Sequence, residues 1–437
     1  MNAFDTVHDD AEDVAHSELA IKQHPVHNDD RECSFHRSLL LRISICARLL
    51  AFVFLRLAVH LPLFDASPHL VDVAPSALSL LRWDAFHFLQ IAQNGYQYEY
   101  QWAFFPALPA LMRGTVALIP QSLRSTPATD LLIGGAMAAI ACDTTRTLYL
   151  LTMHHFGTPK LALLTSLLST LPSSPATLYL APYTEPFFTY LSYRGMLFCA
   201  HAQWLPAAIL FALASSFRSN GIFLAGFLLW GMLLSPFLQE RRIHLSTLSY
   251  SVVLTSLVFS PFIYHNVSAY LTFCTHVASY HPQWCSNFLP SIYTHVQATY
   301  WGSGFLKYWT LQQVPNFLIA APPLLLLYTF STYHLKNALL PRLSAFIQDK
   351  PPARVQDPFL NFSLTPHAIH AFFLTSTLLF ASHTQIILRV AASMPFLYWG
   401  AAWLILDYPS WGSCWVGWSV IWGVLSIILW ATFLPPA

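Results

Sequence analysis

Charged residues are scarce in this chain of 437 residues. Asp, Glu, Lys and Arg make up only 9% of it, against about 25% in ordinary soluble domains. Residues 1–37 alone hold 12 of the 41 charged side chains, so the rest of the chain is poorer still. Apolar residues make up 55%, and a soluble protein of this composition would expose too much apolar surface to stay dispersed. The composition excludes a soluble globular enzyme, a nucleic-acid binder with a basic patch and a disordered chain, and it predicts a membrane protein.

Motifs for metal, redox and nucleotide chemistry are also missing. The seven Cys residues show no CxxC spacing, and no cluster has the spacing of metal ligands. We therefore predict no metal and no cofactor. A glycine-rich phosphate loop is absent from a chain with only 15 Gly residues, which argues against nucleotide binding.

Long apolar runs predict an all-α polytopic membrane protein. The first run, residues 39–64, is expected to be an uncleaved signal anchor, preceded by a disordered acidic tail over residues 1–37. The remaining chain, residues 38–437, is expected to form a single transmembrane domain with roughly nine to eleven membrane helices. Its further apolar runs lie at about 131–151, 161–182, 186–201, 205–217, 221–237, 247–265, 315–333, 367–383, 386–406 and 413–434.

Basic residues in three connections predict the orientation of these helices. These connections are marked by Arg146 with Lys160, by Arg241 with Arg242, and by the basic loop at about 335–365. If all three face the cytosol, the N-terminal tail is cytosolic too. The loops at about 65–129 and 266–314 then lie on the opposite side, where we expect them to carry short interfacial helices.

The loop at 266–314 also holds two candidate modification sites. Cys274 and Cys285 would form a disulfide if this loop faces an oxidising lumen, and two free thiols are the other open interpretation. The sequon Asn266-Val267-Ser268 lies on the same side, close to the membrane. A second sequon, Asn361-Phe362-Ser363, falls in the cytosolic loop and is expected to stay unmodified.

Carboxylates are the first candidates for chemistry, because they are costly to place in or near a membrane. Most of those beyond the tail fit solvated loops, helix caps or, for Asp143 with Arg146, an ion pair one helical turn apart. Three remain: Asp84, Glu99 and Glu185. Asp84 shares a helical face with His87, and aromatic neighbours can desolvate such an acid into a general base. The alternative is an interfacial aromatic belt with a helix-capping Asp.

Residues 82–109, with this cluster, closely resemble the first lumenal loop of the PIG-V family of GPI mannosyltransferases, and further segments resemble the family in the same order. The resemblance covers about residues 38–434. Its motifs are Trp83-Asp84-Ala85, His87-Phe88, Ile91-Ala92, Gly95-Tyr96, Glu99, Ala103-Phe104-Phe105-Pro106, Ala181-Pro182-Tyr183-Thr184-Glu185, Arg218-Ser219-Asn220-Gly221, Tyr300-Trp301, Gly304-Phe305-Leu306-Lys307-Tyr308-Trp309, Gln313-Val314-Pro315-Asn316-Phe317, and His383-Thr384-Gln385 with Arg389.

The resemblance implies a GT-C glycosyltransferase of the endoplasmic reticulum membrane. Such an enzyme takes mannose from dolichol-phosphate-mannose on the lumenal side, and this family adds the second mannose, α1,6-linked, to the GPI precursor glycolipid. A small accessory membrane subunit is implied by the fungal members. The orientation predicted from basic residues places Asp84 on the same, lumenal side. A nucleotide-sugar donor is disfavoured by the missing glycine-rich loop.

Inverting transfer from a β-linked lipid-phosphate sugar needs a base and a cationic site for the phosphate. We assign Asp84 as the base, with Glu99 and Glu185 orienting a sugar hydroxyl or supporting Asp84; a helix-capping role for Glu185 is equally open. The phosphate candidates are Arg218 and Arg389, with Lys307 and Arg82 as alternatives. The alternative interpretation of Arg389 is an ion pair with an acidic residue. The alternative for Arg82 is a charge that snorkels to the membrane interface.

The remaining candidate substrate-binding residues are polar or aromatic. His87 is expected to donate to the phosphate or to orient Asp84, and Trp301 to stack on a sugar or anchor its loop. The others, all from the motifs above, are Asn220, Gln313, Asn316, His383 and Gln385.

Two alternatives to this function stay open at the level of sequence. One is a GT-C glycosyltransferase with another lipid-linked or protein acceptor. The other is a transporter or a membrane scaffold. A transporter of this size should show two similar halves with broken helices, and no such internal repeat is found.

Overall fold

The computed structural model describes residues 7–275, 282–351 and 356–434, with side chains from residue 31 onward. All regular structure in these ranges is helical, which confirms the predicted all-α architecture. The longer helices are α1 (Val7–Ala58), α2 (Asp84–Asn94), α3 (Ala107–Leu118), α4 (Pro127–Ile140), α5 (Thr145–Phe156), α6 (Pro159–Leu168), α7 (Glu185–Ala200), α8 (Trp204–Ser215), α11 (Leu245–Phe273), α13 (Val314–His334), α15 (Thr365–Phe380), α17 (Pro395–Asp407) and α18 (Pro409–Ala431). The shorter ones are η6 (Ser219–Leu224), α9 (Ala225–Leu229), α10 (Ser235–Glu240), α12 (Ile292–Thr299), α14 (Leu340–Ile347) and α16 (Ile387–Val390).

Five helical stretches of the described chain are long and apolar enough to cross a membrane, which makes the protein polytopic. A sixth candidate is a pair of helices bent by 89° at its break, Thr384–Ser393 and Pro395–Asp407. This is fewer than the roughly nine to eleven crossings expected from hydropathy. The five stretches are Arg31–Ala58, Ser219–Glu240, Leu245–Phe273, Leu311–Ile347 and Pro409–Ala431.

Shorter helices inside the bundle account for the difference. The apolar run at 161–182 folds as α6 and a π-turn, because Pro172 and Pro175 interrupt the helix. α7 and α8 pack against each other, and α8 also packs on α11. Hydropathy reports that such residues are apolar, but it does not tell whether lipid or a neighbouring helix covers them.

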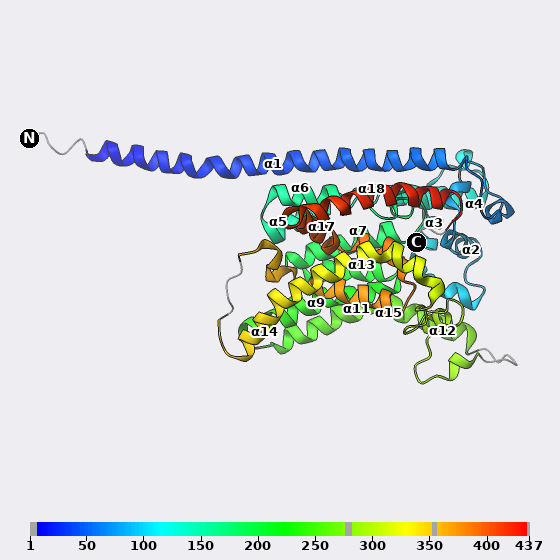
Figure 1. Cartoon of the computed structure of the whole chain (residues 1–437). Coiled ribbons are helices and arrows are strands. Elements are labelled where there is room, and N and C mark those ends of the chain that lie inside the picture. Colours follow the sequence, from blue (N-terminus) through cyan, green and yellow to red (C-terminus); the bar gives the residue numbers. More distant parts are fainter. Residues whose placement is uncertain (1–6, 276–281, 352–355, 435–437) are drawn as a thin grey trace, which may run out of the picture.

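Helix α1 runs along one side of the bundle beside α6 and α18 (Figure 1). Its apolar part, Arg31–Ala58, overlaps the predicted anchor over residues 39–58, and the helix ends six residues before the predicted end at residue 64. The backbone continues as a helix back to Val7, through most of the segment for which a disordered tail is expected. The division of the chain at residue 37 stays a prediction.

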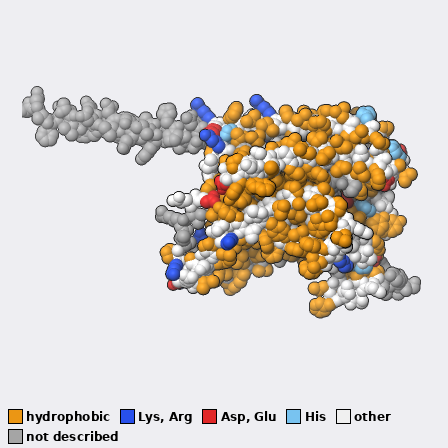
Figure 2. Space-filling view, in the orientation of Figure 1, with side chains coloured by type: hydrophobic (Ala, Val, Ile, Leu, Met, Phe, Trp, Pro, Cys, Tyr) orange, Lys and Arg blue, Asp and Glu red, His pale blue; other side chains and the backbone are white. Residues whose placement is uncertain are grey.

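The two ends of the bundle carry different elements. α2 and α12 lie at one end and α14 at the other (Figure 1). Hydrophobic side chains cover most of the visible face between the ends (Figure 2). α2, α3 and α12 are the short helices expected in the loops at 65–129 and 266–314, whereas α14 belongs to the basic loop at 335–365.

The prediction of an ion pair between Asp143 and Arg146 is wrong. Asp143 instead lies 3.8 Å from Arg48 of α1 and accepts a hydrogen bond of 2.8 Å from the Ser44 hydroxyl. The guanidinium of Arg48 also stacks over the Tyr179 ring. Asp143 lies two residues before the start of α5, and its carboxylate accepts hydrogen bonds from the N–H (3.2 Å) and the hydroxyl (2.8 Å) of Thr145 while it also reaches α1.

Asn266 of the first sequon lies within α11 and is buried. Its Nδ2 donates to the Phe262 carbonyl (2.9 Å), and its Oδ1 accepts from the Ser291 hydroxyl (2.8 Å) and the Tyr293 N–H (3.3 Å). Glycosylation takes place at exposed loops. Both ends of this amide are engaged, and the side chain joins α11 to the start of α12.

We therefore expect Asn266 to carry no glycan. Treatment with a peptide N-glycosidase should leave the gel mobility of the wild-type chain unchanged. The Leu289→Ser variant provides a positive control, because it creates a sequon at Asn287 next to the almost fully exposed Phe288. A glycosidase-sensitive band that disappears in Asn266→Gln would contradict the expectation.

Candidate active site

A cavity of about 690 Å³ lies at the end of the bundle that carries α2 and α12. Its wall is formed by α2, the segment Arg218–Leu224, α12, the loop that follows α12, α15 and the short helix around Arg389. The sequence candidates that line it are Asp84, Arg218, Asn220, Trp301, Lys307, His383 and Arg389. Six other candidates lie behind this wall: His87, Glu99, Glu185, Gln313, Asn316 and Gln385.

Asp84 is the first residue of α2, and a strained turn precedes it. Trp83 has a φ of 47°, and its ring stacks on Phe433 with centroids 5.1 Å apart. The Tyr183 hydroxyl accepts a hydrogen bond from the Asp84 N–H (2.9 Å) and donates one to the Arg82 carbonyl (3.0 Å). Tyr183 thus fixes the backbone on both sides of the turn.

The Asp84 carboxylate is an ion-pair partner rather than a helix cap. No side chain caps α2, and Oδ2 of Asp84 lies 2.8 Å from Nη1 of Arg389. The side chain of Asp84 is 28% exposed and lines the cavity. Of the three candidate carboxylates, it is the one that reaches the cavity wall.

Glu185 joins two arginines beneath the cavity. Its Oε1 lies 2.5 Å from Nη1 of Arg218 and 3.2 Å from Nε of Arg389, and its side chain is only 2% exposed. Arg218 also donates to the Thr184 hydroxyl (3.0 Å). Together with Asp84, the cluster contains two acids and two arginines, so it is electrically neutral. Glu185 is also the first residue of α7, so its carboxylate lies at the positive end of that helix, and the capping role that the sequence left open is compatible with this buried one.

A sharp bend between two successive helices brings Arg389 to this cluster. The helical pair Thr384–Ser393 and Pro395–Asp407 is bent by 89°. Met394, directly before Pro395, is extended, as expected for a residue that precedes a proline. The short arm of the pair carries Arg389, and the ion pair that the sequence left open for this residue is present.

Arg82 has a structural role away from the cavity. Its guanidinium donates to the carbonyls of Trp430 (3.1 Å) and Ala431 (3.0 Å) at the C-terminal end of α18, and to those of Leu78 (2.7 Å) and Leu81 (2.9 Å). A cation suits this position, because helix C-termini carry unpaired carbonyls and a partial negative charge. Arg82 is buried, so it is neither a charge that snorkels to the interface nor a phosphate ligand of the cavity.

His87 lies on the face of α2 that Asp84 begins, as predicted, but packs behind an aromatic side chain. Its ring stacks on Phe104 (centroids 4.5 Å apart) and meets the edge of Trp301. Burial lowers the pKa of His87, an effect that the charge of Asp84 opposes. A neutral imidazole at neutral pH supports the aromatic wall, and in the described chain no hydrogen bond joins it to Asp84.

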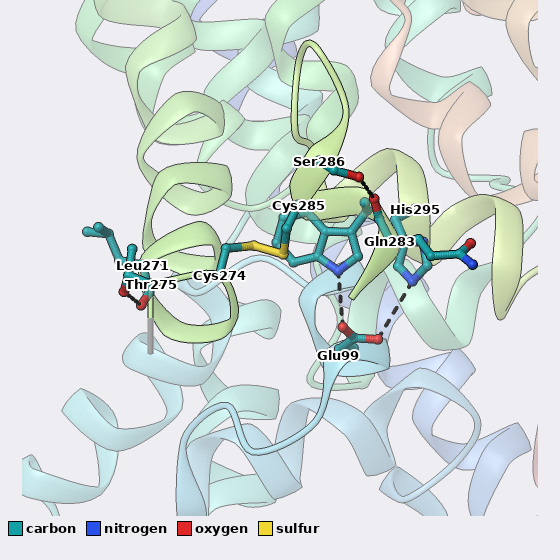
Figure 3. The surroundings of a disulfide bond; sticks show 9 residues. Glu99, Leu271, Cys274, Thr275, Gln283, Cys285, Ser286 and His295 are labelled. Carbon is teal, nitrogen blue, oxygen red and sulfur yellow. Dashed lines mark hydrogen bonds and ion pairs between the residues drawn. A yellow bond between two sulfur atoms is a disulfide. The ribbon is translucent and has the colours of Figure 1, made fainter. Parts of the chain in front are cut away.

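Glu99 holds the segment around α12 in place. Its carboxylate accepts hydrogen bonds from Trp284 Nε1 (3.0 Å) and the Tyr300 hydroxyl (3.2 Å), and lies 3.6 Å from His295 Nε2. The adjacent Cys274 and Cys285 form a disulfide, which decides between the two interpretations left open by the sequence (Figure 3). Glu99 is thus in a supporting position rather than in contact with the cavity.

We expect the disulfide to stabilise this wall of the cavity. A loop of this length gains about 3 kcal/mol from a cross-link in the chain-entropy model. The Cys274→Ser/Cys285→Ser variant should unfold at a lower temperature than the wild type, whereas Cys414→Ser, a change at an exposed free thiol, should not. A maleimide gel shift without reductant that labels all seven cysteines of the unfolded wild type would contradict the pairing.

Gln313, Asn316 and Gln385 form one network behind the cavity. The Tyr308 hydroxyl donates to Gln385 Oε1 (2.6 Å) and accepts from Asn316 Nδ2 (2.8 Å), which also donates to Gln313. The Tyr308 ring stacks on His383, which lines the cavity and bonds the Trp301 carbonyl (2.7 Å). The three amides therefore support the wall through Tyr308.

Lys307 differs from the two arginines of the site. It is exposed, lines the cavity, and has no acidic partner in the described part of the chain. Arg218 and Arg389 are both held by Glu185. Lys307 is thus a cation of the cavity wall whose charge is not already balanced by a neighbouring carboxylate.

Several residues that shape the site had no role assigned from the sequence. Tyr183 stands inside a motif of the family, which was the signal that could have identified it. Thr294 and Gln297 line the cavity from α12 and lie in no motif, so nothing in the sequence distinguishes them from other polar residues of that loop.

Comparisons of sequence and of structure find known proteins that are similar to this chain. The sequence profile of the mannosyltransferase (PIG-V) family matches residues 34–437. GPI mannosyltransferase 2 of Cryptococcus neoformans is 34% identical over 433 residues, covering 91% of this chain and 98% of that protein. GPI alpha-1,6-mannosyltransferase 2 of Homo sapiens is 33% identical over 380 residues, covering 75% of this chain and 73% of that protein. The crystal structure of the oligosaccharyltransferase of Archaeoglobus fulgidus is more distant, with 12% identity, a TM-score of 0.47, and coverage of 90% of this chain and 53% of that one. The chain belongs to the PIG-V family of mannosyltransferases.

Proposed function

We propose that this chain transfers mannose from dolichol-phosphate-mannose to the GPI precursor glycolipid and forms the second, α1,6-linked mannose, with Asp84 as the general base. The observation that carries the proposal is the position of Asp84: a partly exposed carboxylate on the cavity wall, paired with Arg389 of a cluster of largely buried charges. The named relatives are GPI mannosyltransferases, and no observation favours another acceptor, a transporter or a scaffold.

Asp84 acts on the acceptor in this proposal. It takes the proton from the attacking hydroxyl as that oxygen forms a bond to the anomeric carbon of mannose. The bond between the anomeric carbon and the phosphate oxygen breaks, and dolichol phosphate leaves with the electron pair. Phosphate is a good leaving group, so a second carboxylic acid is not required. Glu185 is a positioning residue, because it holds both arginines and does not reach the cavity.

The departing phosphate needs a cationic partner. We assign this role to Lys307 together with Arg389, which lies beside Asp84. Lys307 is free of acidic partners in the described chain, so its charge is available to the donor. Charge-assisted hydrogen bonds to phosphate are about twice as strong as neutral ones. Trp301 and His383 line the same cavity and suit contacts with the sugar and phosphate groups.

The cavity is proposed to face the lumen of the endoplasmic reticulum, with the N-terminus in the cytosol. Two features support this orientation. Basic residues occupy the loop around α14, at the end opposite α2 and α12. The disulfide lies at the end that carries the cavity, and disulfides persist in oxidising compartments. A small accessory membrane subunit remains part of the proposal on the resemblance alone.

Reconstitution tests the proposed function. The purified chain in lipid vesicles, given dolichol-phosphate-mannose and the one-mannose GPI precursor, should form the two-mannose precursor. A chain that transfers mannose equally well to lipid-linked oligosaccharides would favour the other acceptor class. Flux of a solute across sealed vesicles without any acceptor lipid would favour the transporter.

A further inference from the structure

The side-chain nitrogen Nδ2 of Asn220 has no hydrogen-bond partner in the described part of the chain. This nitrogen is shielded from solvent, and the side chain lines the cavity. Buried donors in folded proteins are nearly always paired, because an unpaired one lowers stability. A group that arrives with a ligand would supply the missing acceptor.

The backbone around Asn220 is held on both sides. The Ser219 hydroxyl donates to the Tyr293 hydroxyl (2.6 Å), and the preceding Arg218 is bound to Glu185. On the other side, a Cβ at Gly221 would lie 2.4 Å from Cα of Ser215, so this glycine packs directly against the end of α8. The backbone that carries the amide is thus held in place beside the cavity.

The surroundings of Asn220 suit a neutral hydroxylated group. The charge of Arg218 is balanced by Glu185, whereas Lys307, the unbalanced cation, lies on the loop after α12. Thr294 and Gln297 of α12 contribute two more neutral polar side chains to the cavity wall. Phosphate would favour the region of Lys307, and an uncharged sugar would favour the region of Asn220.

We propose that Asn220 donates a hydrogen bond to a hydroxyl oxygen of the acceptor sugar, and so holds the attacking hydroxyl toward Asp84. The inference deepens the proposed function and rests on it. Ion pairs through Glu185 and Arg389 connect Arg218, two residues before Asn220, to Asp84. Asn220 is then a specificity-determining residue for the acceptor, while the donor is bound by other groups.

Steady-state kinetics of the purified chain in lipid vesicles test the inference. Asn220→Ala should raise the KM for the GPI precursor about tenfold, the usual cost of one lost hydrogen bond to a ligand, with the KM for dolichol-phosphate-mannose unchanged. Asn337→Ala is the matched control, because that exposed amide bonds only a carbonyl of its own helical stretch. Its two KM values should equal those of the wild type.

A second measurement compares two ligands on the same protein, so that a general loss of affinity in the variant cancels. Among acceptor analogues that each lack one mannose hydroxyl, one should bind wild type about tenfold more weakly than the full acceptor, and Asn220→Ala should bind both equally. An increase in the donor KM, unchanged KM values, or the same analogue penalty in both proteins would overturn the inference. In all these outcomes the wild type still transfers mannose, so they differ from a failure of the proposed function.

Discussion

Asp84→Asn is expected to lower kcat for mannosyl transfer by roughly 10²–10⁴-fold, the range that general-base catalysis contributes. Asn keeps the size of the side chain, and the backbone bond from residue 84 to the Tyr183 hydroxyl does not depend on the carboxylate. The protein should therefore fold and bind both substrates. What it loses is the group that accepts the proton from the attacking hydroxyl.

Initial rates of the purified variant, measured over both substrate concentrations, check this expectation. Asp72→Asn is the matched control, because Asp72 lies in the same loop and is exposed. Its kcat should equal that of the wild type. A kcat for Asp84→Asn within about threefold of the wild type would show that another group acts as the base.

Glu185→Gln should have the second largest effect, and it should act on stability as well as on activity. The change removes the negative charge that balances Arg218 and leaves Arg389 with Asp84 alone. Breaking a buried ion pair from one side costs about 3–5 kcal/mol, because the remaining charge is buried without compensation. Thermal unfolding in detergent should occur at a clearly lower temperature, and the donor KM should rise.

Glu240→Gln provides the control for this measurement. Glu240 is exposed at the end of α10, so removing its charge should change neither the unfolding temperature nor the transfer rate. Wild-type stability and kinetics for Glu185→Gln would contradict the role of Glu185 as the holder of both arginines. The two carboxylates differ in degree: Asp84→Asn should lower the unfolding temperature less than Glu185→Gln, because Asp84 is 28% exposed and pairs with one arginine, whereas Glu185 is 2% exposed and pairs with two.

Scarcity of charge made the centre of the site predictable. Charged side chains are costly near lipid, so those in an apolar sequence are candidates for function. Four of them form the centre of the site: Asp84, Glu185, Arg218 and Arg389. Their pairing was beyond reach, since the four residues come from four separate helical segments and only the packing of those segments decides which charges meet. The assignment of Asp143 to Arg146 failed for the same reason: local spacing offered a partner, and packing supplied Arg48 instead.

In the fold, too, the helices could be predicted from the local sequence, whereas the way they pack could not. The all-α membrane architecture follows from apolar composition, and the short helices α2, α3 and α12 were expected in their loops. The number of full crossings was overestimated, because apolar runs such as 161–182 are interrupted by prolines and covered by neighbouring helices. Asn220 was selected from a motif, but its unpaired amide is a property of the folded cavity alone.

One pulse-chase experiment tests the central claim most directly. Microsomes from cells that lack this protein should accumulate a one-mannose GPI precursor, and the added wild-type chain should convert it to the two-mannose form. An equal amount of inserted Asp84→Asn should leave the one-mannose precursor in place. Conversion by Asp84→Asn at the wild-type rate would contradict the account of Asp84 as the catalytic base, and no conversion by the wild-type chain would contradict the proposed reaction itself.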